Sequence, residues 1–270
     1  MLRSSVSLLG SELGLVFRRL RTLVLLVVLA CVPAAIGIAV WVRSGGGGPA
    51  FANQLTNNGL FLVFTGLVVT LPFFLPLTVG VVAGDSVAGE ANRGTLRYLL
   101  VAPAGRTRLL LVKFGGVMAY CFAATFVVAA TGLVVGAALF PLGKVTLLSG
   151  DTIGLGAALL RALIIAVVVA LSLVGLAAIG LFVSTLTGTP IAAMAATVGA
   201  AIAVQIVDTI PQLAVLHPWL FSHYWMSFAG LLRQPIFTGD IVHNLLLQAG
   251  YLAVFGAAAW ARFTSRDIAV

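Results

Sequence analysis

Long apolar runs recur through this sequence, and they limit the folds open to it more than any other feature. A helix needs about 20 apolar residues to cross the hydrocarbon core of a bilayer, and six runs are long enough. We expect spans at about residues 22–42, 60–84, 109–139, 161–183, 190–210 and 245–261. Only 8% of the 270 residues are charged, against about 25% in a soluble domain. The sequence therefore predicts an all-α polytopic membrane protein, folded as a single transmembrane domain over residues 1–270.

Residues 1–21, before the first expected span, have the pattern of an amphipathic helix. Leucine and valine recur at steps of three and four residues, with Arg3, Glu12 and Arg18 between them. A helix of this kind lies along the membrane with its apolar face at the headgroup boundary. We therefore expect an interfacial helix at the amino terminus.

One long polar segment, residues 85–108, lies between the second and third expected spans. It carries Asp85, Glu90 and four arginines. A charge at the centre of a bilayer costs roughly 3 kcal/mol or more, so we expect this segment to lie in water on one side of the membrane.

Residues 90–100 of the polar segment fit a short amphipathic helix. Glu90 would lie in its first turn, where a carboxylate interacts favourably with the helix dipole. Its apolar stripe has i, i+3, i+4 spacing and consists of Leu96, Leu99 and Leu100. Pro103 would end the helix. Such a helix either lies on lipid or enters the groove of a partner protein.

The basic residues fall unevenly on the two sides that six spans create. One side holds both termini and the polar segment, with Arg3, Arg18, Arg19, Arg21, Arg93, Arg97, Arg106, Arg108, Lys113, Arg262 and Arg266. The other side holds Arg43, Lys144, Arg161 and Arg233. The positive-inside rule therefore places both termini in the cytoplasm, in a plasma (inner) membrane. The same rule accounts for the net charge of +8, so the charge does not indicate nucleic acid as a partner.

The motif Glu90-x-x-x-Gly94-Thr95-Leu96-x-x-Leu99-Leu100-x-x-Pro103-x-x-Arg106, followed by Lys113, resembles the cytoplasmic signature of type-2 ATP-binding-cassette (ABC) transporter permeases. In that family the segment is a coupling helix that docks on a separate ATPase subunit. The resemblance implies an exporter with two permease chains and two ATPase chains, in which the ATPase binds ATP and Mg²⁺. The docking residues that it implies are Glu90, Arg93, Gly94, Thr95, Leu96, Arg97, Leu99, Leu100, Pro103 and Arg106. The helix over residues 1–21 is a second possible contact with the ATPase.

The resemblance also implies that the second and fifth spans line the substrate route. Candidate lining residues are Thr65, Thr70, Pro72, Pro76, Thr78, Thr197, Gln205 and Asp208. Each threonine could instead bond its own helix backbone, and Asp208 could simply lie at the water interface. The largely apolar lining favours a hydrophobic or amphipathic substrate. Pro72 and Pro76 lie four residues apart and should kink the second span.

Residues 211–244 form the longest stretch expected on the outer side. Proline breaks it, and Trp219, Tyr224 and Trp225 are residues that settle at the headgroup level. We expect short re-entrant or interfacial helices there, between the fifth and sixth spans.

No catalytic residue and no metal site is predicted. The chain contains no G-x-x-x-x-G-K-[ST] loop, so ATP hydrolysis is expected from the partner subunit. The two cysteines lie inside expected spans, and the three histidines show no ligand spacing. An ATP-independent carrier or channel is an alternative, although carriers usually place ionisable groups at mid-membrane and these spans hold almost none. A membrane factor for the assembly or maturation of another protein is a further alternative.

Overall fold

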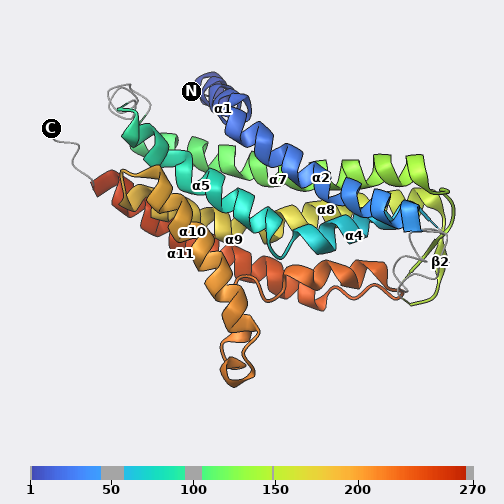
Figure 1. The fold of residues 1–270 in the computed structure, drawn as a ribbon. Helices are drawn as coiled ribbons and strands as arrows, with labels where there is room; N and C mark the ends of the chain where they lie inside the picture. Colours follow the sequence, from blue (N-terminus) through green and yellow to red (C-terminus); the bar gives the residue numbers. More distant parts are fainter. Residues whose placement is uncertain (1, 44–57, 95–104, 148, 266–270) are drawn as a thin grey trace.

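A computed structural model describes residues 2–43, 58–94, 105–147 and 149–265, and helices make up most of it (Figure 1). The α-helices are α1 (Leu2–Arg18), α2 (Leu20–Arg43), α4 (Phe61–Thr70), α5 (Phe74–Asn92), α7 (Arg106–Leu139), α8 (Leu155–Ser172), α9 (Val174–Leu186), α10 (Pro190–Asp208) and α11 (Gly239–Ser265). Three 3₁₀ turns, η1 (Pro211–Leu213), η2 (His217–Trp219) and η3 (Trp225–Leu232), lie between α10 and α11. Strands β1 (Val145–Thr146) and β2 (Thr152–Ile153) pair antiparallel.

Among the described residues, five helical stretches are long and apolar enough to cross a membrane: α2, α7, α8 with α9, α10, and α11. The pair α4 and α5 gives a sixth if it counts as one span, and this pair is bent by 57°. The predicted kink is confirmed, because Pro72 lies in the break. Pro76 is the third residue of α5, where a backbone N–H has no partner within the helix. The all-α, multi-pass architecture expected from composition is therefore present.

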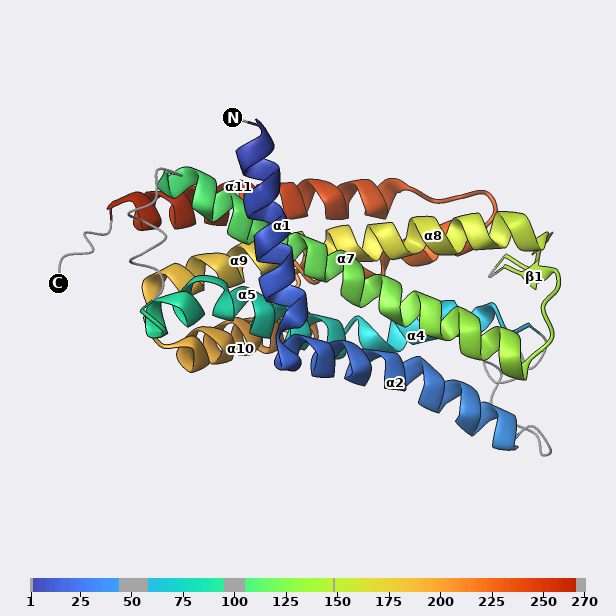
Figure 2. The ribbon, with the colours of Figure 1, turned by 90° about the horizontal axis from the view of Figure 1, so that it is seen from above.

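The main helices run side by side, and α1 crosses them (Figures 1 and 2). The end of α5, the turn from α9 to α10 and the end of α11 lie at one end of the bundle, which we call the terminal end. Strands β1 and β2 lie at the opposite end, which we call the hairpin end. Helix α1 lies across α7 in the half nearer the terminal end (Figure 2).

Helices α4 and α7 pack closely because both have glycine at the contact. A Cβ on Gly136 would collide with the backbone of Gly59, just before α4. A Cβ on Gly132 would lie 2.9 Å from the Cα of Val63. The pattern Gly132-x-x-x-Gly136 is one that permits close helix contact, and both glycines lie at this contact.

The fourth expected span differs from a continuous helix at 161–183. It begins earlier, at Leu155, and breaks at Leu173 before continuing as α9. The break is stabilised from α11, because the Gly175 N–H donates to Gln248 Oε1 at 2.9 Å. The same glutamine donates from Nε2 to the carbonyl oxygen of Phe221 at 2.8 Å. A buried side chain from another helix thus takes over a backbone donor that the broken helix leaves open.

The second expected span also extends further than predicted. Helix α5 continues past Gly84 to Asn92, so Asp85 and Glu90 belong to the helix bundle. The expectation that both acids lie in water is wrong, since Asp85 and Glu90 are each only 4% exposed. The core of the expected coupling helix, residues 95–104, lies outside the described residues.

Candidate functional site

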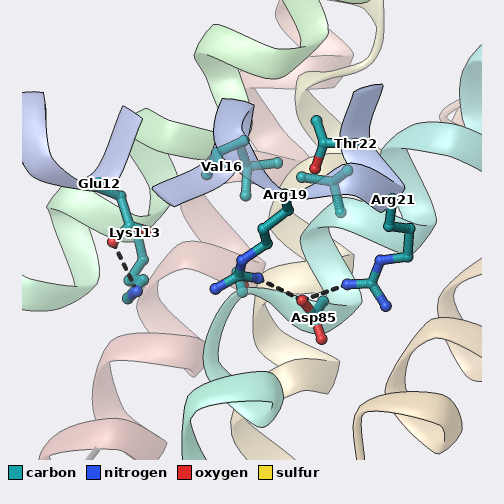
Figure 3. Close-up of a pocket in the computed structure, with 10 residues that line it drawn as sticks. Glu12, Val16, Arg19, Arg21, Thr22, Asp85 and Lys113 are labelled. Carbon is teal, nitrogen blue, oxygen red and sulfur yellow. Dashed lines mark hydrogen bonds and ion pairs between the residues drawn. The ribbon is translucent and has the colours of Figure 1, made fainter. Parts of the chain in front are cut away.

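Six charged side chains meet where α1, α5 and α7 converge, in the half of the molecule nearer the terminal end. We call them the ionic cluster: Glu12, Arg19, Arg21, Asp85, Glu90 and Lys113. Figure 3 shows most of its members around a small pocket, which Val16 and Thr22 also line. The cluster has two halves, one centred on Lys113 and the other on Asp85.

Lys113 is the centre of the first half and is almost fully buried, with 2% exposure. Its Nζ lies 2.8 Å from Glu12 Oε2 on α1 and also bonds Glu90 Oε1 on α5. Two glycines on α7 allow this meeting. A Cβ on Gly115 would lie 3.0 Å from Leu9, and a Cβ on Gly116 would lie 3.1 Å from Glu12 Cγ. The absence of side chains at this point of α7 lets α1 cross closely enough for Glu12 to reach the lysine.

Asp85 is the centre of the second half. Its Oδ2 lies 2.5 Å from Arg19 Nη1 and also pairs with Arg21 Nη2 (Figure 3). The two arginines flank the junction at which α1 ends and α2 begins. Arg93 is more exposed and lies 3.9 Å from the same carboxylate oxygen. A Cβ on Gly89, one turn further along α5, would lie 2.5 Å from Asp85 Oδ1, so this glycine leaves room for the carboxylate.

Charge balance explains how Glu12, Asp85, Glu90 and Lys113 stay buried. The three carboxylates of the ionic cluster face three cationic side chains, so each charge that loses water gains an opposite charge. Such pairs add little net stability compared with apolar residues, but breaking one leaves a buried charge and costs about 3–5 kcal/mol. The ionic cluster therefore makes the position of α1 depend on the positions of α5 and α7.

Helix α5 has a distinctive backbone contact between Asp85 and Glu90. Ser184 Oγ, on α9, donates to the Gly84 carbonyl oxygen at 2.7 Å. It also accepts hydrogen bonds from the N–H groups of Val87 and Ala88, at 3.0 and 2.9 Å. A hydroxyl placed within the i→i−4 ladder of a helix is a known cause of bending. The last turns of α5 are thus attached to α9 through the hydroxyl of Ser184.

The first turn of α7 is attached to the end of α11. Arg106 Nη1 donates to the Thr264 carbonyl oxygen at 2.7 Å, and Trp260 Nε1 donates to Thr107 Oγ1 at 2.9 Å. Gly105, just before α7, has a φ of 73°, which favours glycine. The start of α7 is thus held against the end of α11.

The structure describes some of the predicted docking residues, and the others lie outside the described residues. Glu90 lies in the last turns of α5 and pairs with Lys113, so the expectation that it opens a separate amphipathic helix is wrong. Arg93 is half exposed at the end of α5, and Gly94 follows with a φ of 70°. Arg106 begins α7. The others lie outside the described residues, and their docking role stays a prediction: Thr95, Leu96, Arg97, Leu99, Leu100 and Pro103.

The predicted route residues are found in α4, α5 and α10, apart from Pro72, which lies in the break between α4 and α5. Their hydroxyls follow the alternative interpretation, because each bonds a carbonyl of its own helix: Thr65 to Phe61, Thr70 to Gly66, Thr78 to Leu75 and Thr197 to Ala193. Helices α5 and α10 also pack against each other, since a Cβ on Gly84 would lie 2.7 Å from the Met194 backbone nitrogen. Gln205 is partly exposed on α10, and Asp208 ends that helix. A lining role for these residues stays a prediction.

Sequence reasoning missed the ionic cluster. It placed Lys113 with the basic residues of the cytoplasmic side and Glu12 among the polar residues of the amino-terminal helix. The two residues are 101 positions apart, and periodicity cannot pair residues at that separation. The available signal was the glycine pair at 115–116 next to an isolated lysine inside an apolar run.

Comparisons with known proteins give a family and partial relatives. The model of the family described as "Protein of unknown function (DUF2705)" matches residues 23–269. The chain is 37% identical over 82 residues to "Probable ABC transporter permease protein NosY" of Stutzerimonas stutzeri, which covers 30% of this chain and 28% of that protein. It is 38% identical over 69 residues to the protein of the same description from Pseudomonas aeruginosa, covering 26% of this chain and 25% of that protein. The matched segments span about a quarter of the length of these curated relatives.

Proposed function

We propose that this chain, which belongs to the family described as "Protein of unknown function (DUF2705)", is the membrane-spanning permease subunit of an ATP-driven ABC exporter. Its multi-pass helical fold and its partial similarity to two proteins described as ABC transporter permeases support the proposal. The similarity to permeases is short, so the type-2 class, the export direction and the partner rest on the sequence motif at residues 90–106.

The ionic cluster is the observation that carries the proposal. The motif segment begins at the end of α5 and ends at the start of α7, and both of these helices contribute to the cluster. An ATPase that binds this segment would therefore move α5 and α7 together. Helix α1 would move with them, because the ionic cluster joins it to both. Coupling by rigid-body movement of packed helices needs such a connection.

The contact between Ser184 and α5 marks the point at which α5 would bend during this movement. The hydroxyl bonds the carbonyl oxygen of Gly84 and the N–H of Ala88, and the paired acid Asp85 lies between these two residues in the chain. Bending there would let the charged end of α5 follow the ATPase while the part of α5 packed on α10 tilts differently. In this proposal the coupling segment faces the cytoplasm, in keeping with the basic residues gathered at the terminal end.

The proposed complex contains two copies of this chain and two ATPase subunits, which bind ATP and Mg²⁺. The transported molecule is hydrophobic or amphipathic, in keeping with the apolar faces of α4, α5 and α10. An ATP-independent carrier would lack the ATPase partner. An assembly factor would retain a partner protein, so the proteins bound to this chain distinguish these alternatives from the exporter.

The test is purification of the tagged chain from its native membrane in mild detergent, with crosslinking before extraction and mass spectrometry of the bound proteins. We expect a stoichiometric subunit with a Walker-type ATPase domain, whose ATPase activity changes when this chain is present. Leu96→Ala with Leu99→Ala should weaken its retention at least about tenfold, since the apolar face of an amphipathic helix anchors it in the groove of a partner. Leu111→Ala with Val134→Ala is the matched control, because both side chains are 66% exposed on α7.

Two results would count against the proposal. Recovery of this chain without an ATPase, even after crosslinking, would favour a carrier. Equal retention of the ATPase by the docking pair and the control pair would remove the coupling role of residues 95–104.

A further inference from the structure

A second polar cluster lies at the far end of α10, away from the ionic cluster. Helix α10 leans out from the bundle, and its end projects from the other helices together with the turns that follow (Figure 1). Asp208 is the last residue of α10, His217 opens the η2 turn, and His223 follows six residues later. The chain folds back after α10, and this brings the three side chains together.

The geometry of the three side chains is that of a small ligand set. One potential ligand atom from each lies within 4.8 Å of those of the other two. His223 Nδ1 lies 2.6 Å from Asp208 Oδ1, and the two imidazole rings have centroids 5.7 Å apart. The side chains of His223 and Asp208 are 32% and 23% exposed, so an ion in solution is able to reach them.

A hydrogen bond orients the His217 ring for metal binding. Its Nε2 lies 3.1 Å from the carbonyl oxygen of Ile210, in the turn after α10. A carbonyl only accepts, so Nε2 carries the hydrogen and Nδ1 is left with its lone pair. Histidines that bind metals usually have this arrangement, with the second nitrogen donating to a carbonyl or a carboxylate.

The His223 ring is also held in place. It packs edge-on against Tyr224, with ring centroids 4.7 Å apart, and Tyr224 in turn stacks on His243 from α11. His243 itself bonds the Gly239 carbonyl oxygen through Nδ1 at 2.9 Å and is not part of the ligand set. The ring that faces Asp208 therefore packs on Tyr224, which in turn packs on the last helix.

We propose that Asp208, His217 and His223 bind one divalent transition-metal ion of the Zn²⁺ type. Two imidazoles and one carboxylate are donors that Zn²⁺ favours, and three protein ligands leave a coordination position for water or another ligand. Ca²⁺ and Mg²⁺ prefer sites made mostly of oxygen atoms, so this donor set disfavours them. The bound ion would fasten the turns after α10 to the end of that helix.

The test uses the full chain in detergent, together with any subunit that copurifies, and a tag without histidine. After removal of metals with a chelator, Zn²⁺ is titrated in competition with a chromogenic chelator. We expect one tight site per chain, and at least about 10–100-fold weaker binding in His217→Ala and in Asp208→Asn. His243→Ala is the matched control and should bind as the unaltered chain does. Circular dichroism of each variant checks that the helices are retained.

A spectroscopic measurement keeps the proposal testable if a variant folds poorly. Co²⁺ in the unaltered chain should give visible d–d absorption, and Zn²⁺ should displace it. The proposal is overturned if the unaltered chain binds no stoichiometric Zn²⁺, or if His217→Ala and His243→Ala bind it equally. In either case the contact of Asp208 with His223 would be a hydrogen bond only. This result would leave the proposed permease function untouched, because that function is tested by ATPase retention.

Discussion

Lys113→Met removes the cation that pairs with both Glu12 and Glu90 while keeping an unbranched side chain in the same space. Both carboxylates would then be buried without this partner. Breaking a buried ion pair in this way costs about 3–5 kcal/mol. Glu12 regains water if α1 lifts from α7, so this free energy favours release of the amino-terminal helix. Since about 1.4 kcal/mol is a factor of ten, the release equilibrium should shift roughly 100-fold or more.

The assay is thiol labelling at the buried face of α1. Val16 is 7% exposed and lies against Gly116 of α7, so a cysteine at this position reports release of the helix. The measurement is made in a Cys31→Ala background, because Cys31 is exposed whereas Cys121 is buried. Val16→Cys should react slowly with maleimide in this background and much faster when Lys113→Met is added. When opening is fast relative to labelling, the rate follows the open population, and the ratio of rates gives the shift.

A charge-neutral version of the site decides whether the reasoning is sound. Lys113→Met combined with Glu12→Gln and Glu90→Gln leaves no charge at these three positions. Residues in one network have coupled effects, so the triple variant should label more slowly than Lys113→Met alone. If the triple variant labels as fast as the single one or faster, uncompensated charge is not what releases α1, and the account of the ionic cluster fails.

Three further predictions concern the bundle. Ser184→Ala should leave ATPase binding intact but reduce the effect of this chain on ATPase activity, because α5 loses the contact at its bending point; an unchanged effect on activity would contradict this. Gly136→Ala should lower the free energy of unfolding by about 1–3 kcal/mol through collision with the backbone of Gly59, just before α4, whereas Gly156→Ala, whose Cβ meets no described atom within 4 Å, should not; equal effects would contradict the packing. Lys144→Cys should react with an impermeant thiol reagent on intact cells and Arg93→Cys only after lysis; the reverse result would mean the opposite orientation.

Much of the fold could be predicted from the sequence, because bilayer-crossing helices depend on local properties. Their approximate positions follow from apolar runs of sufficient length, and length and composition are visible residue by residue. The bend at Pro72 follows from the missing N–H of proline, and the close contact at Gly132 and Gly136 follows from the missing Cβ. Each of these features is present in the structure where the sequence placed it.

The tertiary structure alone decided where the charges lie. The sequence alone indicates that Asp85 and Glu90 start a water-exposed segment, because a charged residue beside an apolar run normally marks the end of the membrane span. They are buried instead, since α1 crosses α7 and brings Glu12 to that level of the bundle, and the junction of α1 with α2 brings Arg19 and Arg21 there. The cost of burying a charge depends on which opposite charge arrives, and that partner comes from a distant part of the chain.

The same reason accounts for the break in the fourth span and for the histidine cluster. The break at Leu173 depends on Gln248 of α11, which takes up the Gly175 N–H. The histidines have no ligand spacing in the sequence, and only the reversal of the chain after α10 sets His217 beside Asp208. The sequence by itself determined which segments are helices that can cross a membrane, through local hydrophobicity and backbone chemistry. Only the tertiary structure decided which polar groups meet, because their pairing arises from the packing of helices far apart in the chain.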